Sequence, residues 1–214
     1  MPSNLVQWSG LAALFGGVLG IVLTPPFALA YSLAFEGYAD LPFWSDPIEA
    51  LYPLNFSYGE RVYYTYGRLY FLTLLPELLA LYVLRRIRGG GSGALETWGF
   101  RLSLTGLWLM VLGVFTDYWA DIFPGCLAQM VATPILLAGF LVLGLGLRKG
   151  RAVPCWVTLV MVGAVVCTVP VTLLFVNHMP GGPLLLLHAT WVALGYVLFS
   201  ERVSVTAPTN PRVS

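Results

Sequence analysis

The sequence contains very little charge. Only 10% of its 214 residues are Asp, Glu, Lys or Arg, whereas a soluble domain carries about 25%. Hydrophobic residues make up 58% of the chain, and so few charges cannot cover a surface that faces water. This shortage excludes an ordinary soluble domain and predicts a protein whose main partner is the lipid bilayer.

Lysine and cysteine are nearly absent as well. Lys149 is the single lysine, so arginine supplies almost all of the positive charge, a composition that suggests a GC-rich bacterial genome. The three cysteines, Cys126, Cys155 and Cys167, lack the spacing of a metal site. Cys126 and Cys155 fall in different predicted compartments, so no disulfide framework is implied.

Motifs for catalysis, cofactors and nucleic acids are missing too. The glycine-rich segment 89–93 follows no predicted strand and lacks the Gly-Lys-Ser/Thr ending of a phosphate-binding loop, so we interpret it as a flexible linker. We therefore predict no cofactor and no nucleotide or nucleic-acid partner. The lack of a nucleophile–base pair argues against an enzyme.

Apolar runs of about 20 residues recur along the chain, as membrane-spanning helices require. We predict an all-α, polytopic membrane helix bundle in a single domain, residues 1–200, and a disordered cytoplasmic tail, residues 201–214. The six predicted transmembrane helices cover approximately residues 5–35, 58–87, 95–118, 127–147, 155–176 and 184–200.

The first predicted span has three unusual features. Pro25 and Pro26 remove backbone donors inside it, so a kink or a break is expected there. Gly16 and Gly20 form a GxxxG pair, which permits close helix approach. The segment 28–30 has the Ala-x-Ala form of a signal-peptide cleavage site, but no Lys or Arg precedes the apolar run. A retained span is favoured over a cleaved signal peptide, and both remain open.

The polar connection of residues 36–57 predicts a short helix at the membrane interface, in the first outer loop. Asp46 stands at a helix N-cap, Pro47 at the first helical position, and Glu49 three residues after the cap. The nearby aromatic rings of Phe43 and Trp44 suit the headgroup region.

Positive charge alternates between the predicted loops. Nine of the eleven Lys and Arg residues lie in or beside the connections after the second and fourth spans and in the tail. They are Arg85, Arg86, Arg88, Arg101, Arg148, Lys149, Arg151, Arg202 and Arg212, and the other two are Arg61 and Arg68. The positive-inside rule then places both termini in the cytoplasm, in a multi-pass protein of the bacterial cell membrane.

Glu77 is the one acidic residue predicted to lie deep in a span. Helical geometry places Tyr63, Tyr66, Tyr70 and Thr73 in the same narrow sector of the second span. With no Lys or Arg at matching depth, desolvation favours the neutral form of the acid. These residues predict a path from the outer face to a protonatable group, for a proton, a cation or a polar substrate.

The alternative for the same residues is structural. Tyrosines near the end of a span form an ordinary aromatic belt. A protonated Glu77 also suits a hydrogen bond to a neighbouring helix, or to a carbonyl that Pro76 leaves without a donor.

A second candidate site lies near the outer ends of the spans. Arg68, Asp117, His178 and His188 are predicted at a similar level, and a histidine there changes its charge near neutral pH. Their spacing lacks the signature of a zinc site, and no second histidine lies deeper for haem ligation, so no metal is predicted. Asp121 stands four residues after Asp117 and would share its helix face if the helix extends that far.

Three functions fit these observations. A small proton-linked transporter that uses Glu77 is favoured, with an oligomer completing the path if six spans do not suffice. The first alternative is a membrane sensor, assembly factor or accessory subunit with a protein partner. An intramembrane enzyme that acts on lipid ranks third.

Overall fold

The protein is all-helical over the residues that a computed structural model describes, which are 3–31, 34, 59–89, 93–175 and 182–200. Six helices account for nearly all of these residues, and no strand occurs among them. They are α1 (Ser3–Tyr31), α3 (Gly59–Ile87), α4 (Ala94–Trp119), α5 (Ile122–Lys149), α6 (Cys155–Phe175) and α7 (Gly182–Phe199). The helical fold class expected from the apolar runs is confirmed.

Several expectations concern residues outside the described ranges. They are the interfacial helix in 36–57, most of the 89–93 linker, His178 and the tail after residue 200.

Four of the six helices are long and apolar enough to cross a membrane. They are α1, α3, α4 and α5. The apolar helical stretches found in α6 and α7, Cys155–Pro170 and Leu184–Phe199, are shorter. A membrane protein with several transmembrane helices therefore agrees with the fold.

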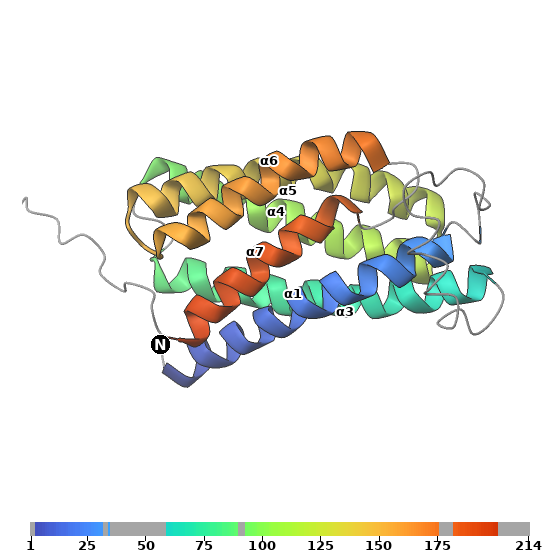
Figure 1. Cartoon of the computed structure of the whole chain (residues 1–214), viewed down its shortest axis with the longest axis horizontal. Helices are drawn as coiled ribbons and strands as arrows, with labels where there is room; N and C mark the ends of the chain where they lie inside the picture. The colour runs from blue at the N-terminus through green and yellow to red at the C-terminus, as the bar shows by residue number, and fades with distance from the viewer. Residues whose placement is uncertain (1–2, 32–33, 35–58, 90–92, 176–181, 201–214) are drawn as a thin grey trace, which may run out of the picture.

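The six helices are arranged as a closed ring. Each helix packs against its neighbour in the chain, and α7 packs back against α1 (Figure 1). Successive helices run in opposite directions, so one end of the bundle holds the start of α3 and the end of α4, and the other holds the end of α3 and the start of α4. We call these the Tyr63 end and the Arg88 end.

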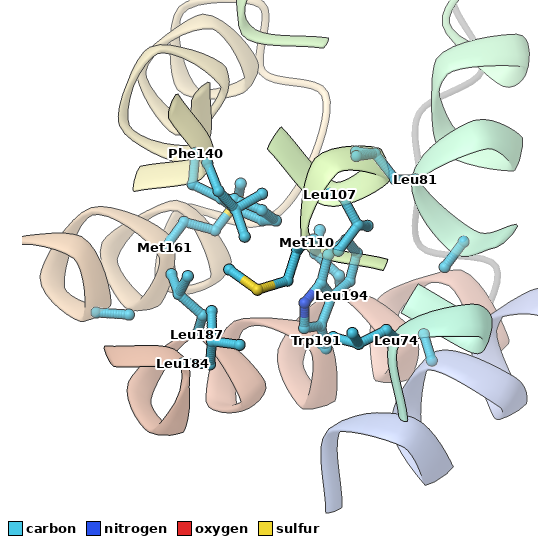
Figure 2. Packing of buried hydrophobic residues seen from close by; sticks show 14 of the residues in the cluster. Leu74, Leu81, Leu107, Met110, Phe140, Met161, Leu184, Leu187, Trp191 and Leu194 are labelled. Atoms are coloured by element: carbon cyan, nitrogen blue, oxygen red, sulfur yellow. The ribbon is translucent and has the colours of Figure 1, made fainter. Parts of the chain in front are cut away.

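Apolar side chains fill the interior of the ring (Figure 2). Leu107, Met110, Phe140 and Trp191 are each at most 1% exposed. The rings of Phe140 and Trp191 meet edge to face with centroids 5.1 Å apart, a favoured aromatic geometry. The centre of the bundle is therefore a packed core.

Glycines bring α4 and α5 unusually close together. Small residues recur every seven residues on each helix: Gly99, Gly106 and Gly113 on α4, and Gly125, Ala132, Gly139 and Gly146 on α5. A Cβ atom added at Gly106 would stand 2.6 Å from the backbone nitrogen of Leu136. Small residues at helix contacts let the backbones approach and are typical of membrane helix pairs.

The two prolines of α1 do not break it. The helix runs through Pro25 and Pro26 to Tyr31, although each proline leaves one carbonyl of the preceding turn without its helical donor. The hydroxyl of Thr24 donates to the carbonyl of Gly20 at 2.7 Å. Packing against both α3 and α7 supports the helix on either side of this point.

The connection between α4 and α5 is shorter than the sequence indicates. α5 begins at Ile122, so only Ala120 and Asp121 separate the helices. Asp121 caps α5 by accepting from the backbone N–H of Phe123 at 2.9 Å. Asp117 and Asp121 therefore belong to different elements and do not share a helix face.

A buried ion pair closes the Arg88 end. Arg88 Nε donates to Glu96 Oε1 at 2.8 Å, and its Nη2 donates to Oε2 at 3.3 Å. Both side chains are at most 2% exposed. This two-pronged geometry satisfies both charges where α3 turns into α4.

Alanine in place of Gly106 should destabilise the protein, because its methyl group must push the α5 backbone at Leu136 away from α4. Overpacking of this kind costs about 1–3 kcal/mol. Gly163→Ala is the matched control, since an added Cβ meets nothing within 4 Å there. Unfolding in mixed micelles by SDS titration should show a loss for Gly106→Ala alone, and equal stabilities would contradict this account of the contact.

Candidate functional site

Glu77 lies where three helices meet. It belongs to α3 and is 1% exposed. On one side α1 approaches so closely that a Cβ at Gly16 would stand 2.8 Å from the carbonyl oxygen of Thr73 and 3.2 Å from the Pro76 side chain. On another side α7 brings His188 to the acid. The carboxyl group therefore faces protein and not lipid.

Glu77, His188 and Tyr70 form a continuous hydrogen-bonded chain, which we call the relay. His188 Nδ1 lies 2.7 Å from Glu77 Oε1, and His188 Nε2 lies 2.7 Å from the Tyr70 hydroxyl. When Nδ1 carries the proton of a neutral imidazole, it donates to the carboxylate and Nε2 accepts from Tyr70. All three residues are at most 2% exposed.

Glycines of α1 make room for the histidine. A Cβ atom at Gly20 would stand 2.5 Å from three atoms of the His188 ring, and one at Gly17 would stand 2.7 Å from the His188 carbonyl oxygen. The ring of Tyr70 meets the imidazole edge to face, with centroids 5.4 Å apart. The imidazole is thus fixed between α1 and α3, in line with both of its partners.

The three groups of the relay have the chemistry that proton exchange requires. A buried carboxylate without a partner is strongly unfavourable, whereas Glu77 and His188 together are neutral overall, either as an ion pair or as two uncharged groups. One further proton makes the pair cationic, and loss of one makes it anionic. Because each of the three groups can accept or donate a proton, the relay is suited to hold a proton and pass it on.

The tyrosine ladder of α3 does not continue unbroken to the Tyr63 end. Tyr63 accepts a hydrogen bond from the Tyr118 hydroxyl at 3.0 Å, but the ring of Phe27 stacks on both Tyr63 and Tyr70, with centroids 5.3 and 5.5 Å away. An apolar ring therefore separates the outer tyrosine pair from the relay. Tyr66 is only half-buried.

The side chain of Thr73 forms a hydrogen bond within its own helix. Its hydroxyl donates to the carbonyl of Tyr70 at 2.7 Å, and the side chain is completely buried. It therefore lies beside the relay without being a link in it.

Three residues of the predicted outer polar cluster, Arg68, Asp117 and His188, each have a different hydrogen-bond partner, and His178 lies outside the described residues. His188 belongs to the relay. Arg68 donates from Nε to the Tyr118 carbonyl at 3.2 Å, and its guanidinium carbon lies 5.4 Å from the centre of the Trp119 ring. Asp117 belongs to α4 and contacts α5, where its carboxylate accepts a hydrogen bond from Gln129 Nε2 at 2.7 Å.

No metal-binding group emerges from the part of the chain that the structure covers. Within it, no three His, Cys, Asp or Glu side chains lie close enough to hold an ion.

Sequence reasoning missed the pairing of His188 with Glu77. The histidine stands six residues after the start of α7, and the acid stands 18 residues after the start of α3. These depths match because α7 is short and begins well inside the bundle (Figure 1). A usable signal is that His188 is the one ionisable side chain of α7 other than Tyr196, and a buried acid needs such a partner.

Double-mutant analysis should show that Glu77 and His188 stabilise each other. His188→Leu leaves the acid buried without its partner and should cost about 1–3 kcal/mol of unfolding free energy. Adding Glu77→Leu to that variant removes the stranded group, so the double variant should lose less than the sum of the single variants. Unfolding in mixed micelles measures all three. Strictly additive losses would show that the 2.7 Å contact carries no coupling energy.

Comparison with known proteins gives no relative for this arrangement: no protein-family model, no curated protein and no solved structure matches the chain.

Proposed function

We propose that the protein is a small proton-linked transporter in which the Glu77–His188–Tyr70 relay binds the proton. The observation that carries this proposal is the pair of 2.7 Å contacts that His188 makes with a buried acid and a buried phenol. Ionisable groups inside a membrane bundle are unfavourable and usually functional. The relay places an acid, an imidazole and a hydroxyl next to one another in that order, so a proton can pass from each group to the next.

The proposed topology has six spans and both termini in the cytoplasm. With a rise of about 1.5 Å per residue, the 21 residues of α6 and the 18 of α7 extend over roughly 31 and 27 Å. A bilayer core is about 30 Å thick, so both helices are long enough to cross with small adjustments. By the positive-inside rule, the arginine-rich connections favour the cytoplasmic side of the plasma membrane for the Arg88 end.

In this conformation the relay is sealed in both directions. Phe27 separates it from the tyrosines of the Tyr63 end, and the apolar core with Leu81 and Leu84 separates it from the ion pair at the Arg88 end. Proton exchange with water therefore requires these barriers to open in turn. Such alternation is what couples a proton to the movement of a second substrate.

A non-transporting role is the second candidate, and the filled interior favours it. The relay connects α3 to α7 and packs against α1, so it also serves as a structural junction. A sensor, assembly factor or accessory subunit needs no path through the bundle.

A lipid-acting enzyme is not favoured. The order Tyr70, His188, Glu77 is similar to a nucleophile, base and acid, but Tyr70 is only 2% exposed. A lipid has no access to its hydroxyl in this arrangement.

Proton movement into proteoliposomes tests the first candidate. Under an imposed membrane potential, lumenal pH should change at least tenfold faster with wild type than with Glu77→Gln, because the amide cannot carry the proton. Asp121→Asn is the matched control and should move protons as wild type does, since Asp121 is an exposed helix cap and asparagine caps equally well. Equal rates for wild type and Glu77→Gln would reject transport through the relay and favour the structural role.

Cysteine labelling tests the topology. Cys126 and Cys155 are both exposed, and they stand at the starts of α5 and α6, at opposite ends of the bundle. A membrane-impermeant maleimide added to intact cells should label Cys126 and leave Cys155 unlabelled, and inside-out vesicles should give the reverse. Cys126→Ser and Cys155→Ser assign each signal. Labelling of Cys126 from the cytoplasmic side would overturn the orientation.

A further inference from the structure

A second buried acid, Asp117, lies at the Tyr63 end and takes no part in the relay. Asp117 is 5% exposed, and its Oδ2 accepts from Gln129 at 2.7 Å. Its other oxygen, Oδ1, is buried and has no hydrogen-bond partner among the residues that the structure describes. Within the described ranges no Lys or Arg forms an ion pair with it, and the nearby Arg68 is turned toward Trp119.

An orphaned carboxylate oxygen in this position is unfavourable unless a positive group meets it. Leaving a buried polar group unsatisfied costs about 1–3 kcal/mol, and more when the group is charged. A single amide donor such as Gln129 does not neutralise the charge. Oδ1 therefore points to a cationic ligand or to a proton.

Aromatic rings gather beside the acid. Tyr63 and Tyr118 are hydrogen-bonded to each other and both interact electrostatically with Asp117. Tyr64 meets both of them edge to face, with centroids 5.6 and 6.3 Å away. Ring faces attract cations, most strongly where water is excluded.

The combination selects one class of cation. A bare metal ion needs several oxygen ligands, whereas no three metal-ligating side chains gather within the described residues. One carboxylate oxygen together with aromatic rings instead fits an ammonium group with apolar substituents, which offers N–H donors and contacts ring faces.

We propose that Asp117 and the surrounding tyrosines bind an organic cation, a protonated amine with an apolar body, as the substrate that is exchanged for protons. This inference rests on the proposed transport function and names its substrate class. Asp117 holds the ammonium group through Oδ1, while Tyr63, Tyr64 and Tyr118 contact the rest of the ligand. Because Asp117 is nearly closed to water, binding displaces side chains at this end of the bundle.

Calorimetric titration of the full chain in lipid nanodiscs tests the proposal. Phenethylammonium is the probe, and 2-phenylethanol, which has the same ring without the charge, is the control ligand. Wild type should bind the amine and not the alcohol. Asp117→Asn should weaken amine binding at least tenfold while keeping a side chain that can bond to Gln129, and Asp121→Asn should bind as wild type does.

A second variant keeps the test decisive if Asp117→Asn fails to fold. Tyr64→Leu retains an apolar side chain at a half-buried position but removes the ring face, and should weaken amine binding severalfold. Equal affinity of wild type and both variants would overturn the proposal. A heat signal with sodium chloride alone that disappears in Asp117→Asn would also overturn it, by showing an inorganic cation site.

The two proposals fail in different ways. If wild type moves protons and Glu77→Gln does not, but no amine binds, the substrate class is wrong and the transport function stands. If the amine binds through Asp117 and proton flux is the same in Glu77→Gln, the binding site stands and the transport function is wrong.

Discussion

The contact between Glu77 and His188 constrains three helices at once, because it joins α3 to α7 at a point where α1 also packs closely. A carboxyl group in the interior of a membrane bundle must be hydrogen-bonded, and its partner arrives from a helix 111 residues away in the chain. For the imidazole to reach it, α1 must have no side chain at Gly20. The position of α7, the glycines of α1 and the face that α3 turns inward all follow from satisfying one acid.

Small residues decide which helices can come this close. On α4 and α5 they recur every seven residues, the period at which two nearly antiparallel helices keep the same faces in contact. At Gly106 the gap to the facing backbone is too narrow for even a methyl group. Larger side chains then collect in the interior, where Phe140 and Trp191 meet. The ring is therefore tight at its glycine contacts and filled at its centre.

Much of the fold could be predicted from the sequence, because membrane helices are marked by long apolar runs. The inward face of α3 could also be predicted from the sequence. Helical spacing puts Tyr63, Tyr70, Thr73 and Glu77 on one side of the helix, and all four are buried. The depth of His188 in the bundle could not be predicted from the sequence. Its short distance from the start of α7 places it near the outer end of the helix, and only the arrangement of the described helices shows that α7 starts deep in the bundle. The ion pair of Arg88 and Glu96 was missed for a similar reason, because each residue looked like an isolated charge near a helix end.

That ion pair also bears on how the protein enters the membrane. Arg88 and Glu96 are only eight residues apart, so the contact can form as soon as α3 and α4 have emerged from the ribosome, before α5, α6 and α7 are synthesised. Glu96 lies in the first turn of α4, where the helix dipole favours a negative charge. Neutralised within one hairpin, the two charges present a smaller barrier to insertion than either does alone. The α3–α4 hairpin is thus equipped to insert as a unit, onto which α5, α6 and α7 assemble as they are synthesised.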